Sequence, residues 1–341
     1  MVSWVLMPRR KALTIRLKRY GVENIAVLTS GTDAPGMNAA IRAVVRTAIN
    51  NNVRIWGVYD GYRGLVDDNM EELTSISVAD IIQRGGTFLG TSFCKRFRTK
   101  EGRQLAYENL KKHNIDALIV IGGDGSLRGA EEFERETGFS VIGIPATIEN
   151  DIWGTDYAIG TDTAVNTILQ AINEIRDTAK AHRRTFIIEV MGNKCGWLAT
   201  YSAVAGGGNM VIVPEEEFDK EKIINKVQKL HDGGKSYLVI LASEGTGNMQ
   251  ELVKELEART GISTRLTVLG LVQRGGSPTA NDRVFASVLG EQATLAAISG
   301  LHNIVFGMQR GNIVCIDLRD AITNKKEYPE DLRHLAEVIS L

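Results

Sequence analysis

The chain has 341 residues, which suits two medium-sized domains better than one small core. Its formal net charge of -1 excludes a field strong enough to steer nucleic acid. No apolar run approaches the ~18 residues of a membrane span, and the three scattered cysteines exclude a disulfide framework or a zinc site. We therefore expect a cytoplasmic protein with neither a nucleic-acid partner nor a membrane partner.

The first 20 residues are the one unusual stretch of the composition. Such a basic stretch without acids is typical of an organelle presequence or of a basic arm for a partner. It is equally typical of a disordered tail or of translation from an upstream start codon. The apolar piece at residues 4–7 is too short for a secretory signal, so we expect residues 1–21 to form a disordered basic extension. The basic residues are Arg9, Arg10, Lys11, Arg16, Lys18 and Arg19.

From residue 25 onward, apolar runs alternate with glycine-bearing loops and helical segments. The first run, residues 25–28, precedes a helix predicted to begin near Met37. Runs that are apolar on both faces are typical of buried parallel strands, so the pattern predicts a doubly wound α/β fold. No low-complexity linker divides the chain, which favours two interleaved α/β domains. Further strands are predicted at residues 53–59, 117–121, 141–144, 186–190, 210–213, 237–242 and 266–269.

In such a fold, ligands bind at the carboxyl ends of the strands, which makes the loops there candidate sites. The loop of residues 122–126 is the strongest. Its glycines let backbone amides approach phosphate oxygens, and a helix expected to begin at Ser126 points its positive end at an anion. Asp124 is suited to hold a magnesium ion that bridges phosphates. The segment alone is equally typical of a structural turn, but similar loops at residues 29–36 and 147–151 favour ligand binding.

Five ordered segments carry a family resemblance: APGMNAAIR at residues 34–42, RGGTFLG at 84–90, GGDGS at 122–126, EVMG at 189–192 and QRGGSP at 273–278. The chain resembles the bacterial-type ATP-dependent 6-phosphofructokinases, which are glycolytic kinases. The resemblance implies a larger nucleotide-binding domain at residues 22–160 plus 273–323, and a smaller sugar-phosphate domain at residues 161–272 plus 324–341. It also implies fructose 6-phosphate as substrate, ATP as phosphoryl donor, Mg²⁺ as cofactor and a homotetramer.

The resemblance assigns roles to single residues, and the sugar-phosphate positions largely match. Thr147 corresponds to a residue that touches the transferred group. Arg274 corresponds to a phosphate ligand, and arginine forks suit a phosphate monoester. Leu271 replaces a histidine that usually contacts the 6-phosphate, so we expect a weakened affinity. The other matched substrate positions are Met191, Gly192 and Glu244, together with Arg184 and Arg265, which the family extends into the neighbouring subunit's site.

The nucleotide side of the site matches the family less well. Thr32 and Ala146 replace two glycines, and their side chains occupy space that the phosphates need. We therefore expect ATP to bind weakly. The matched positions are Gly31, Gly123, Gly125 and Ser126 for the nucleotide and Asp124 for Mg²⁺.

Three positions at the reacting centre also depart from the family. Glu149 replaces the aspartate base with a side chain one methylene longer, and Phe93 and Asn193 replace two arginines that neutralise developing charge. A displacement near 1 Å costs about 10²-fold in rate, and a lost charge-stabilising donor costs roughly 10²–10³-fold. Thr147, the base Glu149 and the orienting Asp151 therefore form an impaired catalytic set. Three nearby cations are candidates for compensation: Lys95, Arg96 and Lys194.

The resemblance implies an effector site between subunits, and this site is only partly matched. Its phosphate-binding positions correspond to Arg42, Arg46, Arg176 and Lys235, but Arg42 and Arg46 are equally typical of the polar face of a helix. Replacements elsewhere in the site argue against the allosteric response of the family. They are Ser75, Asn209 and Gly233, where an arginine, an acid and a lysine are expected.

Two functions from different classes stay open. In the first, the chain is a kinase that phosphorylates fructose 6-phosphate with MgATP at a reduced rate. In the second, it is an inactive paralogue that binds sugar phosphate and serves as a regulatory or structural subunit, in a hetero-oligomer with an active sister chain. A pyrophosphate-dependent kinase is a weaker third hypothesis, because that subfamily usually carries an aspartate at Gly125 and a lysine at Ala146. The pattern favours the kinase with impaired catalysis.

Overall fold

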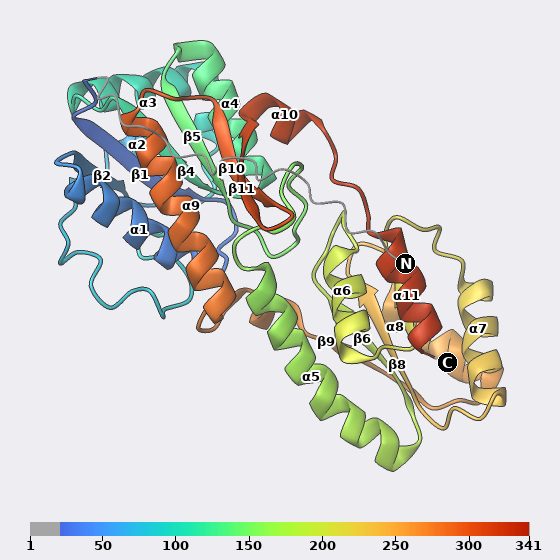
Figure 1. The fold of residues 1–341 in the computed structure, drawn as a ribbon. Coiled ribbons are helices and arrows are strands. Elements are labelled where there is room, and N and C mark those ends of the chain that lie inside the picture. Colours follow the sequence, from blue (N-terminus) through green and yellow to red (C-terminus); the bar gives the residue numbers. More distant parts are fainter. Residues whose placement is uncertain (1–20, 341) are drawn as a thin grey trace, which may run out of the picture.

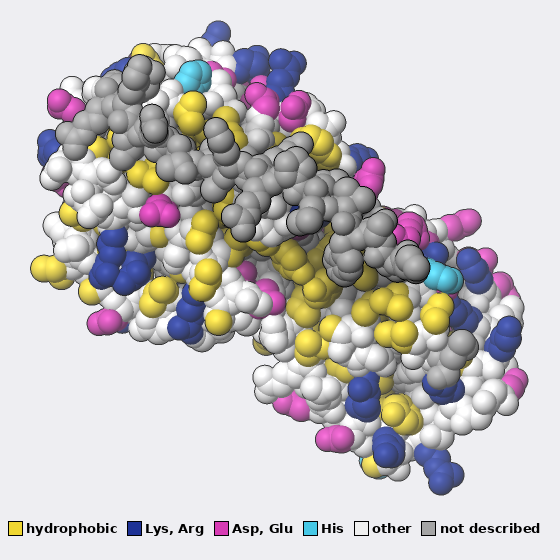
Figure 2. Space-filling model, viewed as in Figure 1, with side chains coloured by type: hydrophobic (Ala, Val, Ile, Leu, Met, Phe, Trp, Pro, Cys, Tyr) yellow, Lys and Arg dark blue, Asp and Glu magenta, His cyan; other side chains and the backbone are white. Residues whose placement is uncertain are grey.

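The computed structural model describes residues 21–340. They form two lobes, each built around its own β-sheet (Figure 1). The predicted basic extension lies, apart from Gly21, outside the described residues. Within residues 21–340, no helix is both long enough and apolar enough to cross a membrane. On the face shown in Figure 2, acidic and basic side chains are interspersed over both lobes, as the balanced composition predicts.

The larger sheet has seven strands in the order β11-β10-β5-β4-β1-β2-β3. All neighbouring strands run parallel except for two antiparallel pairs at the edges, β2 with β3 and β10 with β11. The chain order reverses between β1 and β4, which makes their carboxyl ends the switch point of the sheet. The strands are β1 (Asn24–Ser30), β2 (Arg54–Val58), β3 (Met70–Glu72), β4 (Ala117–Gly122), β5 (Ser140–Pro145), β10 (Ile304–Gln309) and β11 (Asn312–Asp317).

Helices cover both faces of this sheet, which explains why its central strands are apolar throughout. In β1, Ile25 and Val27 pack into one core cluster, whereas Ala26 and Leu28 pack into the other. The first cluster lies under α1 (Met37–Asn50) and α9 (Ala280–Ile298). The second lies under α2 (Tyr62–Asp67), α3 (Lys100–Lys112), α4 (Asp124–Thr137) and α10 (Leu318–Thr323).

The smaller sheet is entirely parallel, with strand order β7-β8-β6-β9. Its strands are β6 (Thr185–Val190), β7 (Met210–Ile212), β8 (Leu238–Ser243) and β9 (Thr264–Val268). One face packs in the core cluster that continues from the larger lobe, beside α5 (Thr161–His182), α6 (Trp197–Gly206) and α11 (Glu330–Ile339). The other face packs against α7 (Lys220–Asp232) and α8 (Met249–Thr260).

The doubly wound α/β fold predicted from the sequence is confirmed, and the eight predicted strands all occur. The helix after β4 begins at Asp124 and not at Ser126, because Gly123 is the extended capping residue and the acid occupies the favourable first turn. The chain passes between the lobes at α5, at the short helix η2 (Gly270–Arg274) and before α11 (Figure 1). The two domain ranges named above stay a prediction.

Asp282 links two helices: it lies in α9 and binds the amino terminus of α5, the helix through which the chain enters the smaller lobe. Its side chain, at the start of α9, is 2% exposed. One carboxylate oxygen accepts a hydrogen bond from the Gly160 amide at 2.8 Å, and the other accepts from the amide and hydroxyl of Thr163 at 2.8 and 2.5 Å. Burial raises the pKa of Asp282, and these hydrogen bonds oppose that rise.

We expect Asp282→Ala to destabilise the protein by about 1–3 kcal/mol, because it leaves buried donors at the start of α5 without an acceptor. Urea unfolding followed by circular dichroism measures the change. Glu291→Ala is the matched control, since Glu291 is an exposed acid on the same helix. Equal midpoints for the two variants would contradict this role for Asp282.

Candidate active site

A cavity of about 570 Å³ opens at the switch point of the larger sheet. Its walls are the loops that follow β1, β4 and β5, so residues far apart in sequence meet at one edge. Nine of the residues predicted from the sequence line it together: Gly31, Gly123, Asp124, Gly125, Ser126, Thr147, Glu149, Asp151 and Arg274. Thr32, Phe93 and Ala146, three of the substituted positions, line the same cavity, whereas Asn193 is exposed and lies outside its lining.

The loop after β1 needs a glycine at residue 31 because its backbone lies close to α4. Gly31 has a φ of 81°, a conformation that residues with a side chain rarely adopt. A Cβ atom at Gly31 would lie 2.8 Å from the Ser126 hydroxyl in the first turn of α4. The loop and the helix amino terminus are therefore packed against each other. The positive end of α4 and the nearby amides make this wall of the cavity suited to an anion such as a phosphate.

The acids Glu149 and Asp151 flank a buried asparagine that fixes the turn between them. Asn150 is 0% exposed and has a left-handed φ of 53°. Its side-chain amide donates to the Asp156 carbonyl at 2.9 Å, and its side-chain oxygen accepts from the Ala158 amide at 2.9 Å. Both polar ends of the side chain are thus occupied, which holds the two acids at the end of β5.

Glu149 is partly buried and bridges the two lobes. One carboxylate oxygen accepts from the Asn193 amide at 3.3 Å. Burial raises the pKa of Glu149, and the negative charge of Asp151 raises it further. The amide of Asn193 and the positive charge of Arg274 oppose the rise. A carboxylate with a raised pKa in a cleft is suited to accept a proton, so the environment fits a general base.

Asp151 and Asp124 give the cavity a negative charge that a divalent cation would balance. Burial raises the pKa of Asp151, as does the charge of Asp124. The Asp151 Oδ1 atom is buried and has no hydrogen-bond partner. Asp124 lines the cavity and pairs with Arg128 at 2.7 Å. Residues 21–340 contain no group of three or more metal-ligating side chains. An Mg²⁺ ion at this place would be held by a carboxylate together with substrate phosphates.

Three of the predicted substrate positions lie on the smaller lobe, outside the lining of the cavity. The Met191 amide donates to the buried Gln273 side chain at 3.1 Å, and the Gly192 carbonyl accepts from the Gly245 amide at 3.2 Å. Glu244 follows β8, is exposed, and contributes to the electrostatics of Glu149. Of these three residues, Glu244 is the one whose charge acts on Glu149, and it raises the pKa of that acid.

Arg184 and Arg265 do not line the cavity. Arg265 pairs with Glu257 at 2.9 Å and also donates to the Thr264 carbonyl. Arg184 precedes β6 and acts electrostatically on the same Glu257. Their predicted reach into a neighbouring subunit stays a prediction.

At the reacting centre, Phe93 stands where an arginine was expected, and most of the cations that could compensate lie elsewhere. Phe93 is 59% exposed, and the Arg98 guanidinium lies 4.5 Å from its ring centre. Of the predicted compensating cations, Arg96 pairs with Asp67 at 2.5 Å. Lys95 and Lys194 are exposed and lie outside the lining. Among residues 21–340, the basic side chains that line the cavity are Arg98 and Arg274. Arg98 was not predicted from the sequence, because it lies outside the five matched segments.

The predicted effector residues make separate contacts within residues 21–340. Arg46 lines an open groove between α1 and α9. Arg176 donates to the carbonyls of Gly206 and Gly207, and Lys235 donates to the Ser340 carbonyl at 2.6 Å. Their role, like that of Arg42, stays a prediction.

The family model described as phosphofructokinase matches residues 24–297. An ATP-dependent 6-phosphofructokinase of Bacillus pumilus is 46% identical over 94% of this chain and 100% of its own, and one of Clostridium botulinum is equally similar over the same shares. Among solved structures, phosphofructokinase from Saccharomyces cerevisiae matches at 33% identity with a TM-score of 0.81, over 93% of this chain and 46% of its own. Phosphofructokinase from Pichia pastoris matches at 34% identity with a TM-score of 0.84, over 94% of this chain and 37% of its own.

The raised pKa of Glu149 predicts that its charge destabilises the fold at neutral pH. The stability that this group contributes is present below its ordinary pKa of 4.5 and is lost as the pH rises through the raised, folded-state pKa. Glu149→Gln should therefore raise Tm at pH 7–8 by about 2–4 °C, the shift produced by ~1 kcal/mol in a domain of 150–250 residues. Glu327→Gln, at an exposed position, is the control in calorimetry. Equal Tm values for both variants across pH 5–8 would rule out this effect.

Proposed function

Because the chain belongs to the phosphofructokinase family, we propose that it transfers the γ-phosphoryl group of MgATP to the 1-hydroxyl of fructose 6-phosphate, at a reduced rate. The observation that carries this proposal is the pair Glu149 and Asp151, held at the end of β5 in one cavity with the glycine loops of β1 and β4. Phosphoryl transfer needs a base, a helix terminus that binds an anion, and a pair of acids whose charge a cation can balance.

In this proposal, Glu149 accepts the proton of the sugar hydroxyl, and Asp151 keeps Glu149 oriented and basic through its negative charge. Thr147 contacts the transferred group, and its hydroxyl already accepts from the Glu149 amide at 3.2 Å. Mg²⁺, held by Asp124, would neutralise phosphate charge when bound. The nucleotide lies against Gly31, Gly123, Gly125 and Ser126.

The sugar phosphate binds between the lobes in this proposal. Arg274 supplies positive charge at the cavity, and its Nε atom is buried without a hydrogen-bond partner, which leaves a donor for an anionic ligand. Met191, Gly192 and Glu244 approach from the second lobe. Arg184 and Arg265 serve the site of a neighbouring subunit in a homotetramer, and the protein is cytoplasmic.

A second candidate is supported by Phe93 and Asn193. Phe93 brings an exposed ring to the cavity, and Asn193 contacts Glu149 only through its backbone amide. If the charge lost at these positions is not replaced, the chain is a catalytically inactive subunit that binds sugar phosphate and associates with an active sister chain. The two candidates differ in turnover and share the binding of fructose 6-phosphate.

Crowding by Thr32 and Ala146 predicts weak nucleotide binding. The double variant Thr32→Gly with Ala146→Gly should bind MgATP roughly tenfold or more tightly, since it reopens the space next to the glycine loops. Titration calorimetry with a non-hydrolysable ATP analogue measures this change. Unchanged binding of fructose 6-phosphate is the internal control. A native chain that already binds the nucleotide as tightly as the double variant would overturn the crowding argument.

Restoring the altered positions should raise kcat. Phe93→Arg and Asn193→Arg return charge-stabilising donors, each of which is worth roughly 10²–10³-fold, and Glu149→Asp returns the shorter base. The triple variant should gain more than any single variant, because the arginines act on the same developing charge. A coupled assay of fructose 1,6-bisphosphate at saturating substrates provides the rates.

Equal kcat values for the native chain and the triple variant would remove the impaired-catalysis proposal in favour of a fully active kinase. A native chain with no turnover, next to an active triple variant, would instead support the inactive subunit. If the triple variant also binds both ligands without turnover, the defect lies outside these three positions, which would contradict the proposal.

A further inference from the structure

Lys326 lies on the last segment that connects the two lobes, between α10 and α11. Its ammonium group donates a hydrogen bond to the Asp156 carbonyl at 3.0 Å. That same carbonyl accepts from the side-chain amide of Asn150 at 2.9 Å. Lys326 and Asn150, far apart in sequence, thus share one acceptor. Since Asn150 separates the two acids of the site, Lys326 is tied directly to the turn that holds them.

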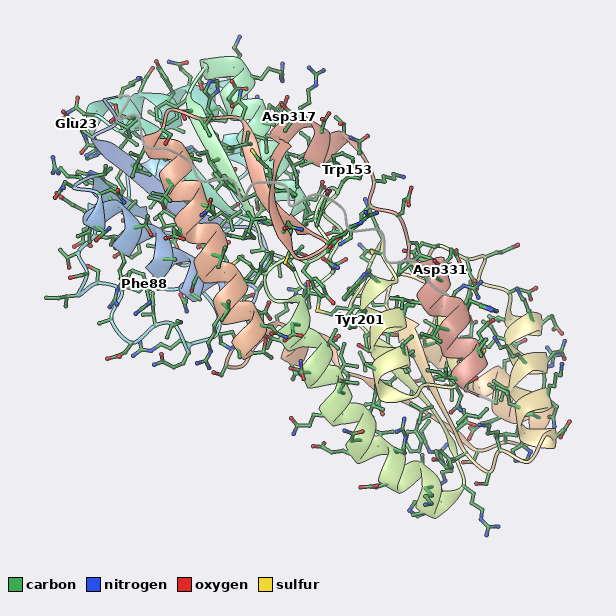
Figure 3. The ribbon with its side chains drawn as sticks, in the orientation of Figure 1. Glu23, Phe88, Trp153, Tyr201, Asp317 and Asp331 are labelled. Carbon is green, nitrogen blue, oxygen red and sulfur yellow. The ribbon has the colours of Figure 1, made fainter. Side chains whose placement is uncertain are left out.

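One aromatic side chain of the smaller lobe, Trp197, lies next to this lysine. Its ammonium lies 6.0 Å from the ring centre of Trp197, which stacks on Tyr201 at 4.5 Å. The Tyr201 hydroxyl lies 2.8 Å from the hydroxyl of Tyr157. Tyr201, labelled in Figure 3, lies on α6 where the two lobes meet. The ring of Trp197 attracts the cation and adds to the hydrogen bond that positions it.

The charges around Lys326 connect it to Asp151. Burial lowers the pKa of Lys326 to about 8, whereas Cys195, Asp156 and Asp151 act in the opposite direction. In return, Lys326 lowers the pKa of Asp151 against the effect of burial. Arg274 acts in the same sense on Glu149. The two acids are thus influenced by cations from different segments of the chain.

We propose that Lys326 is a positioning residue of the active site, which fixes the turn at Asn150 through the shared Asp156 carbonyl and places a positive charge near the acid pair. The inference rests on the proposed function, because its catalytic consequence requires Glu149 to act as the base. An ionised Asp151 raises the basicity of Glu149, and a fixed turn keeps Glu149 directed at the sugar hydroxyl. Lys326 thus acts through both acids without touching the reacting atoms.

The test compares four full-length chains: native, Lys326→Met, Lys326→Arg and Lys325→Met. Lys325→Met is the matched control, since it removes an exposed lysine from the adjacent position. Hydrogen exchange by mass spectrometry follows peptides that cover residues 146–160. We expect several-fold faster exchange there in Lys326→Met, where one hydrogen bond to the turn is lost, and native exchange in Lys325→Met. Native exchange in Lys326→Met would overturn the positioning role, whether or not the chain is an active kinase.

Turnover tests the electrostatic half of the inference. Lys326→Met should lower kcat about tenfold or more, leave KM for fructose 6-phosphate unchanged and move the acidic limb of kcat to higher pH, because the acid pair loses a nearby positive charge. Lys326→Arg should restore most of kcat. A fall in KM and kcat together, or no change in the acidic limb, would overturn this half.

The alkaline side gives an independent readout. The pKa of Lys326 is about 8, so its charge is lost as the pH rises through that value. The native chain should therefore lose activity above pH 8, whereas Lys326→Arg should keep its activity. Identical alkaline profiles would contradict the role of this charge. A native chain without turnover rejects the proposed function, and the exchange experiment then still accepts or rejects the positioning role.

Discussion

The site depends on the side chain of Asn150, which uses both of its polar ends to close the turn after β5. Without these two hydrogen bonds, a left-handed asparagine in a buried position would not be stable, and the acids on either side would have no fixed direction. The parallel sheet brings this turn to the same edge as the loops of β1 and β4. The fold therefore sets the position of the two acids, and the buried side-chain amide of Asn150 sets their orientation.

The electrostatics of the cavity follow mainly from the burial of its acids. Burial raises the pKa of Glu149 and of Asp151, and neighbouring acids raise both further. Such an arrangement costs folding stability and gains basicity, the trade expected at a catalytic site. It also explains why cations from remote segments matter. Arg274 arrives from the end of η2, and Lys326 arrives from the last connection between the lobes.

Much of the fold follows from the sequence because its signals are local. The continuous apolar runs predict the central parallel strands, since each is covered by helices on both sides. The edge hairpin of β10 and β11 escaped prediction because its connection, Arg310–Gly311, places an arginine at a left-handed position where asparagine or glycine is usual. The short β3 has no apolar face of its own and exists through its pairing with β2.

The site residues that directly follow strands could be predicted from the sequence. Those whose role depends on contacts between distant segments could not. Gly31, Asp124 and Glu149 each follow a strand, so the topology alone brings them together. Arg96 was a plausible compensating charge by its proximity in sequence, but Asp67 binds it. Lys326 has no motif around it, and only the folded chain reveals its contact with the turn. Long-range charge pairs of this kind leave no local pattern.

The central claim is that Glu149, held by the turn at Asn150, is the base of a phosphoryl transfer. Single-turnover transfer of label from [γ-³²P]ATP to fructose 6-phosphate, measured for the native chain and for Glu149→Gln, tests it most directly. The account predicts that the native chain forms labelled fructose 1,6-bisphosphate, and that Glu149→Gln does so about 10²–10⁴-fold more slowly while it still binds both ligands. Transfer by Glu149→Gln at the native rate would contradict the account.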